Sequence, residues 1–294
     1  INDRFKYCKA RWEKIRTQGQ TDMRYVAGDP WAANDRLARE LAGRPCLSFD
    51  EIGQYENQAI NELKANKLAV KFSPTGNGAN DDTADFYAAK WREIEYRSNG
   101  SDAYVNAAKD AIERSYGYIR LTTKRVSRKT FNQELWIEEF PNPDVVFPDP
   151  DAQDRTSKDM KYCFVVESRS HREFTREFPK AEIKNFDNTL IAANPAWLGQ
   201  DRVQVAEYWT VETTQRELIE LIGPNGDVLE MFLDELPDEK LPKGAKIGKR
   251  EMVDEPKVMQ YLTNGVEILE RNEWAGEYIP IVACYGKLLG VDQG

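Results

Sequence analysis

GYIRLTTKR at 117–125 is followed by FNQELWIEEF at 131–140, by PNPDVVFPDPDAQD at 141–154 and by MKYCFVV at 160–166. Apolar and polar side chains alternate along the first stretch, and this period of two predicts a half-buried strand. The same alternation predicts a second strand over 131–140. Residues 127–130 are polar and few enough to form the hairpin loop between the two strands.

Four prolines follow within ten residues, at positions 141, 143, 148 and 150. Each proline fixes φ and removes a backbone donor, so neither a helix nor a central strand can pass through this segment. We expect Val145, Val146 and Phe147 to form a short apolar plug between rigid turns. Residues 162–166 are predicted to form a third strand.

The sequence upstream predicts helices at 2–18, 34–41 and 81–97, and a further helix that begins with Ser101 as its cap. Apolar spacing in that last helix aligns Tyr104, Ala108 and Ile112. Ser48 and Glu51 have the spacing of a capping box. The helix predicted after them has an apolar stripe of Phe49, Ile52, Ala59 and Leu63. A short strand is predicted at 68–72.

The other side of the helix after Ser48 carries neutral amides rather than charges, at Gln54, Asn57, Gln58 and Asn61. Amides cost less free energy to bury than charges do. Two interpretations therefore stay open for this side of the helix: a contact with another subunit, or a solvated surface.

Residues after 166 contain a capping box at Ser170 and Glu173, and then a β-rich region from Val203. Two Asn-Gly pairs, at 225–226 and 264–265, predict hairpin turns. The predicted strands are 217–222 and 228–232 around the first turn and 258–262 and 266–269 around the second, with a separate strand at 246–253.

The chain has 294 residues and a net charge of −9. This length predicts a sizeable core and two structural units. No apolar run approaches the roughly 20 residues that span a bilayer. The first residue is Ile1 rather than Met, and we expect the chain to be a fragment. A tight nucleic-acid binder usually has a basic face, whereas an acidic chain suits a conduit through which DNA slides.

Candidate catalytic and metal-binding residues are few. Asp149, Asp151 and Asp154 resemble a metal loop, but an EF-hand counted from Asp149 has Asp at its sixth position and Met at its twelfth, where Gly and Glu are needed. Turns in which aspartates bind nearby backbone explain them better. A nuclease site would combine Asp149 with Glu167 and a lysine two residues on, but Arg occupies that position.

Other catalytic patterns are also lacking. His171 is the single histidine, and Cys8, Cys46, Cys163 and Cys284 are far apart in the sequence. A zinc site is therefore not expected. No P-loop motif occurs. We predict a protein without catalytic, cofactor-binding or metal-binding residues, and therefore not an enzyme.

Taken together, four segments resemble the portal proteins of short-tailed, double-stranded-DNA bacteriophages. The resemblance begins near Cys46 and includes QYENQAINELKAN at 54–66. The hairpin and proline segment at 117–154 follows, then VQVAEYW at 203–209, and finally AGEYIPIVACYGK at 275–287. These matches occur in the order that the family has them.

The resemblance implies an α+β fold in three parts. Residues 1–203 would form a wing-like portal body of helices and sheet. Residues 204–274 would form a β-rich protruding element, similar to a stem or clip. Residues 275–294 would return to the body and stop before the channel-lining helix of the family.

The resemblance also implies a function. Portal proteins form dodecameric rings at one capsid vertex, and DNA enters and leaves through the axial channel. The implied partners are other copies of the chain, the terminase large subunit, capsid or scaffolding protein, tail adaptor proteins and, transiently, double-stranded DNA, with no membrane. The implied location is the virion, assembled in the bacterial cytoplasm. The alternatives are another virion structural or adaptor protein, or the metal-dependent nuclease.

Overall fold

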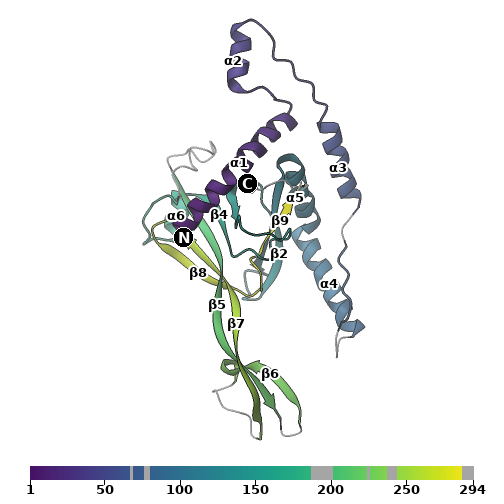
Figure 1. Ribbon diagram of the computed structural model, residues 1–294, viewed down its shortest axis with the longest axis vertical. Helices are drawn as coiled ribbons and strands as arrows, with labels where there is room; N and C mark the ends of the chain where they lie inside the picture. The colour runs from purple at the N-terminus through teal and green to yellow at the C-terminus, as the bar shows by residue number, and fades with distance from the viewer. Residues whose placement is uncertain (67–68, 76–79, 187–200, 224–225, 237–243, 287–294) are drawn as a thin grey trace. The chain divides into compact units, whose positions relative to one another are not determined.

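The computed structural model describes residues 1–66, 69–75, 80–186, 201–223, 226–236 and 244–286. It contains helices and antiparallel strands, which confirms the predicted α+β class (Figure 1). The chain divides into two compact units, which are described separately below. Unit 1 comprises 1–166 and 280–294, and unit 2 comprises 167–279.

The elements of unit 1 are α1 (Asn2–Val26), α2 (Ala33–Leu41), α3 (Gly53–Ala65), α4 (Asp81–Ser98), α5 (Gly100–Arg114), β1 (Tyr116–Arg125), β2 (Gln133–Glu139), η1 (Pro143–Val145), β3 (Val146–Pro148) and β9 (Ile281–Tyr285). Strand β4 (Tyr162–Ser170) begins in unit 1 and continues into unit 2. Unit 2 contains α6 (His171–Glu177), β5 (Arg202–Ile222), β6 (Val228–Phe232), η3 (Leu233–Glu235), β7 (Lys246–Thr263) and β8 (Ile268–Trp274).

Strand β1 is the centre of a three-stranded antiparallel sheet in the order β2–β1–β9. The predicted hairpin joins it to β2 and places Leu121 opposite Ile137. Strand β9 comes from the other end of the chain and places Cys284 opposite Gly117. The two sequence segments of unit 1 are therefore held together by backbone hydrogen bonds.

Helix α5 packs against β1 at very short range. A Cβ atom added to Gly117 would lie 2.0 Å from the carbonyl oxygen of Ala107. The helix faces the sheet with three small side chains, since Ala103, Ala107 and Ala111 are all buried. The predicted stripe of 104, 108 and 112 was therefore wrong by one position, because close packing selects small residues over large apolar ones.

The other face of β1 is covered by aromatic side chains from α1. Trp12 lies edge-on to Tyr116, with 6.2 Å between ring centroids, and stacks on Tyr285 at 6.4 Å. Tyr116, Gly117 and Tyr118 are all buried. The start of β1 is thus buried on both faces rather than on one, which corrects the prediction of a half-buried strand for these residues.

The proline strap, residues 141–150, is held by side chains of α1. The Arg16 guanidinium donates hydrogen bonds to the carbonyl oxygens of Asp144 and Val146 and lies 3.8 Å from the ring centroid of Phe147. The Trp12 indole and the Cys8 thiol both donate to the carbonyl of Pro148, at 3.0 and 2.9 Å. Of the predicted apolar plug, Val146 and Phe147 are fully buried, whereas Val145 is half-buried and ends η1.

Several helix boundaries differ from those predicted. Helix α1 continues to Val26, because Gly19 packs against the backbone of Arg114 and so keeps the second half of the helix on α5. Helix α3 begins at Gly53 instead of after Ser48, whose hydroxyl donates to the carbonyl of Gly28.

Two further predictions also fail. Helix α5 starts directly after Asn99, which has the left-handed φ of 52°, so Ser101 is not its cap. Residues 69–72 form no strand, and Leu68 lies outside the described residues.

Unit 2 is built on two hairpins that the Asn-Gly pairs predicted. β5 pairs with β6 and β7 pairs with β8, and Gly226 and Gly265 have the positive φ values of 85° and 89° that such turns need. Asn225 lies outside the described residues. The strands predicted at 246–253 and 258–262 are one continuous β7, because it pairs with β5 over its whole length.

The core of unit 2 lies where α6 meets β5 and β7. Phe174, Val203, Val205 and Leu262 are buried together there. The capping box predicted at Ser170 and Glu173 is confirmed. Further along β5, the Arg216 guanidinium binds Glu255 at 2.8 Å and Asp234 at 2.5 Å, which ties η3 to the paired strands β5 and β7.

We predict that Gly117→Ala destabilises the protein by about 3 kcal/mol or more, because its methyl group would overlap the α5 backbone rather than a flexible side chain. Urea denaturation followed by circular dichroism measures the change. Gly223→Ala is the matched control, since a Cβ there meets its nearest atom at 3.5 Å. A tolerated Gly117→Ala would contradict the close packing of α5 on β1.

We also predict that Arg16→Met lowers the free energy of unfolding by about 2–4 kcal/mol, because two strap carbonyls lose their donor and Phe147 loses a cation–π contact. Arg11→Met, at an exposed position of the same helix, should change it by less than about 0.5 kcal/mol. Equal effects of the two substitutions would show that Arg16 does not anchor the strap.

Candidate intersubunit surface

The acidic loop after the strap is a set of turns. The Asp149 carboxylate is buried and accepts hydrogen bonds from the backbone amides of Asp151 and Lys161, at 3.1 and 3.2 Å. Asp154 accepts from the amide and hydroxyl of Thr156, and these bonds lower the pKa of its carboxyl. The turn interpretation is confirmed for Asp149 and Asp154, whereas the Asp151 carboxylate accepts a hydrogen bond from the Tyr7 hydroxyl at 3.0 Å. Among the described residues, no group of three potential ligands could hold a metal ion.

The cysteines and the histidine have structural surroundings. All four cysteines are free thiols, and burial raises the pKa of Cys8 to about 12, so its thiol stays protonated and donates to the strap. His171 begins α6, and its backbone amide donates to the carbonyl of Asp201. Neither arrangement contains an activated nucleophile.

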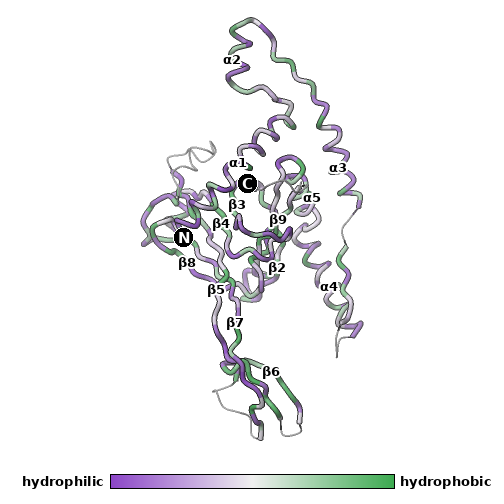
Figure 2. Tube along the Cα trace, in the orientation of Figure 1, coloured by the Kyte–Doolittle hydropathy of each residue, from purple (hydrophilic) through white to green (hydrophobic). Residues whose placement is uncertain are grey.

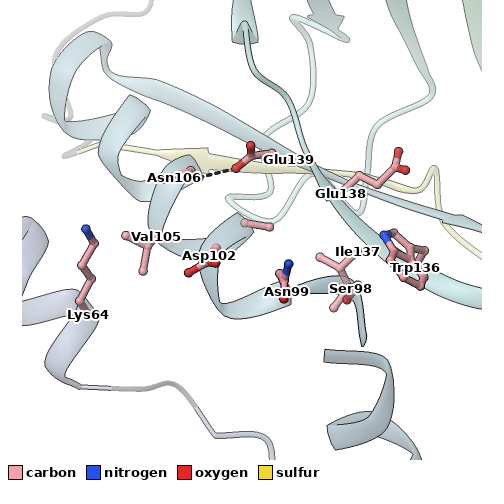
Figure 3. A pocket seen from close by; sticks show the side chains of 11 residues that line it. Lys64, Ser98, Asn99, Asp102, Val105, Asn106, Trp136, Ile137, Glu138 and Glu139 are labelled. Carbon is pink, nitrogen blue, oxygen red and sulfur yellow. Dashed lines mark hydrogen bonds between the residues drawn. The ribbon is translucent and has the colours of Figure 1, made fainter. Parts of the chain in front are cut away.

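A cavity of about 480 Å³ lies between α5 and β2 (Figure 3). Two of the acidic side chains that line it have partners: Asn106 donates to Glu139, and Glu138 binds Lys124 at 2.6 Å and Arg120 at 3.1 Å. Although burial alone would raise the pKa of Glu138, these bonds hold it below its usual value. Two cations of β1 therefore neutralise the charge of Glu138 beside this cavity.

Hydrophobic and hydrophilic residues are interspersed along α2, α3 and α4 (Figure 2). Many of the large apolar side chains of these helices and of residues 42–52 are exposed. The exposed fractions reach 81% for Leu41, 82% for Phe49 and 84% for Tyr96. We call this group the apolar set; it consists of Leu37, Leu41, Leu47, Phe49, Ile52, Tyr55, Leu63, Phe86, Tyr87 and Tyr96. So many exposed apolar side chains are typical of a protein–protein contact.

Residues 28–48 are closed by local hydrogen bonds rather than by a core. The Ser48 hydroxyl donates to the carbonyl of Gly28 at 2.6 Å, and the Trp31 indole donates to that of Leu47 at 3.1 Å. Arg39 lies over the Trp31 ring. No residue of α2 is buried. These hydrogen bonds hold the backbone of residues 28–48 in place, while the apolar side chains of this segment stay available to a partner.

The residues that are buried on helix α3 differ from those that the sequence predicted. Ile60 is its buried residue, whereas Phe49, Ile52 and Leu63 of the predicted apolar stripe are exposed. The four amides at 54, 57, 58 and 61 are also exposed. The subunit contact predicted for those amides thus stays a prediction, and the exposed stripe adds to it.

The contact between α3 and α5 contains two facing carboxyl groups, Glu56 and Glu113. Partial burial and, next, a hydrogen bond with Glu113 raise the pKa of Glu56. Two carboxylates at hydrogen-bonding distance repel each other unless one of them holds a proton. The attachment of α3 to the rest of unit 1 therefore contains a proton-dependent contact.

Comparisons with known proteins give a consistent result. A family model described as phage P22-like portal protein matches residues 2–294. The portal protein of Acyrthosiphon pisum secondary endosymbiont phage 1 is 25% identical over 285 residues. That alignment covers 91% of this chain but 39% of the phage protein, so the chain spans well under half the length of this curated relative. Within the described residues, no helix combines the length and apolar character needed to cross a bilayer.

We predict that Glu56→Gln makes stability less dependent on pH. A raised carboxyl pKa means that the folded state binds more protons, so the free energy of unfolding falls as the pH rises from the ordinary value of 4.5 through the folded pKa. The amide should therefore raise the unfolding midpoint at pH 8 and change it little at pH 4. Thermal unfolding at both pH values tests this, with Glu62→Gln, exposed on the same helix, as control. Identical pH profiles for Glu56→Gln and the unsubstituted protein would contradict it.

Proposed function

The chain belongs to the phage P22-like portal protein family, and from this premise we propose that it forms part of a ring-shaped portal at one capsid vertex. The observation that carries the proposal is the match of the family model over residues 2–294. In the proposed ring, twelve copies surround an axial channel, and double-stranded DNA passes through that channel during packaging and ejection.

The apolar set supplies a physical reason for assembly. Its leucines and aromatic residues lie in water in a single chain, and covering them would gain free energy of about 25 cal/mol for each Å² removed from solvent. Aromatic side chains are enriched in the centres of protein interfaces. A contact between two different surfaces closes into a ring when the rotation between copies divides a full circle evenly.

The proposed role is structural rather than catalytic, as is usual for this family. The carboxylates of Asp149 and Asp154 accept hydrogen bonds from backbone amides, and Glu138 of the α5–β2 cavity is paired with Lys124. We propose that the terminase large subunit, capsid or scaffolding protein and tail adaptor proteins bind the assembled ring in the virion. The motor rather than this chain would hydrolyse ATP.

We assign the parts of the chain to this architecture as follows. The body is proposed to comprise residues 1–203 and 275–294, and the protruding element residues 204–274. The two compact units divide at other positions, after 166 and after 279. The long paired strands β5 and β7, with β6 beside the last residues of β5, form the segment that we propose protrudes.

Negative-stain electron microscopy of the full-length protein tests the proposal. We expect closed rings with a central hole. A full-length protein that stays monomeric at micromolar concentration would refute the proposed function.

The apolar set can be tested separately in the full-length protein. Leu41→Ser with Phe49→Ser should reduce ring formation strongly, because losing the burial of two large side chains costs about 3 kcal/mol, or roughly 100-fold, at each contact. Circular dichroism should not change, because both side chains are exposed in the single chain. The control is Ile15→Ser with Ile112→Ser, which are also exposed but lie outside the apolar set. Equal ring yields for the two pairs would exclude the apolar set from the interface.

A further inference from the structure

The charges of the chain are divided unequally between the two units. Unit 1 contains 27 acidic and 27 basic residues, counting Asp and Glu against Lys and Arg. Unit 2 contains 23 acidic and 14 basic residues. The whole net charge of −9 therefore belongs to unit 2, and copies of unit 2 placed side by side repel one another.

The hairpin between β1 and β2 has the opposite character. No acidic residue occurs between Arg114 and Glu134, while five basic residues occur there. Two of the five, Arg120 and Lys124, bind Glu138. The other three are Arg125, Arg128 and Lys129, and none of them makes an ion pair with any residue that the structure describes. We call residues 125–131 the basic tip.

The basic tip also exposes apolar groups. Phe131 has 88% of its surface in solvent and Val126 has 41%. The Arg125 guanidinium lies 5.5 Å from the centroid of the Phe131 ring. Such a combination of an exposed aromatic ring with arginines is typical of residues that contribute most to protein interfaces.

We propose that the basic tip of one copy binds the acidic unit 2 of a neighbouring copy. This inference rests on the proposed ring. A head-to-tail contact needs two different, complementary surfaces on one chain, and a positive surface in unit 1 and a negative unit 2 meet that need. The three cations that lack an ion pair would then reduce the repulsion between neighbouring acidic units.

The apolar content of the basic tip favours a protein partner over DNA. A duplex offers phosphates to the cations, but its bases are stacked and give Phe131 and Val126 little to cover them. A protein surface can offer carboxylates and apolar groups together. Duplex DNA is therefore the competing outcome that the experiments must distinguish.

The first experiment reverses charge in the full-length protein. Arg125→Glu with Arg128→Glu should lower the fraction of rings at least tenfold in mass photometry at low salt. Raising NaCl should weaken assembly of the unsubstituted protein and affect this variant much less, because screening acts on the pairs that the variant lacks. Lys6→Glu with Lys14→Glu makes the same change of charge on exposed positions of α1 and should leave ring formation unchanged.

The second experiment locates the partner. Phe131→p-benzoylphenylalanine in an equal mixture of ¹⁴N- and ¹⁵N-labelled full-length protein should give, after irradiation, cross-links between differently labelled copies within residues 167–279. Cross-links to residues of unit 1, or only within one copy, would overturn the proposal.

The outcomes separate this proposal from the function on which it rests. If the unsubstituted full-length protein forms no rings, both fall. If it forms rings and Arg125→Glu with Arg128→Glu forms them equally well, only the proposed contact falls. If that variant instead loses affinity for a fluorescent DNA duplex while its rings stay intact, the basic tip is a DNA contact and the proposal is wrong.

Discussion

The carbonyl groups of the proline strap need hydrogen-bond donors, and α1 supplies them. Prolines remove amide donors from the strap, so it cannot satisfy itself in the way that a sheet or helix does. Arg16, Trp12 and Cys8 donate to three of its carbonyls from one side of α1. This arrangement fixes the helix over the strap, and Trp12 then also covers the open face of β1 through Tyr116 and Tyr285.

The second constraint is the short distance between α5 and β1. Because Gly117 and three alanines make that contact, unit 1 uses small residues where its helix meets its sheet. Many of its larger apolar side chains are left on α2, α3 and α4, where they face solvent. A chain with this distribution has part of its apolar surface still to bury, and the proposed ring of copies would cover it.

The charges of the chain are also distributed unequally, in this case between the two units. Unit 1 is neutral as a whole but has three cations on the basic tip that form no ion pair with a described residue, whereas unit 2 carries the net charge. An acidic unit repels phosphate groups, including those of the DNA that would pass through the proposed channel. The same acidity makes neighbouring copies repel, so a stable ring requires positive groups between them. The basic tip and the apolar set are therefore complementary contributions to one proposed assembly.

Much of this fold was predictable from the sequence, because its signals are local. Alternating side chains marked β1 and β2, Asn-Gly pairs marked both hairpins of unit 2, and Ser170 with Glu173 marked the start of α6. The run of cations without an acid at 114–133 is also visible in the sequence alone, and so is the family resemblance. The positions of the apolar side chains were not predictable. Which stripe of α5 is buried depends on Gly117, and whether Phe49 is covered depends on what packs against α3. Those contacts join residues distant in the chain, so only the tertiary structure decided them.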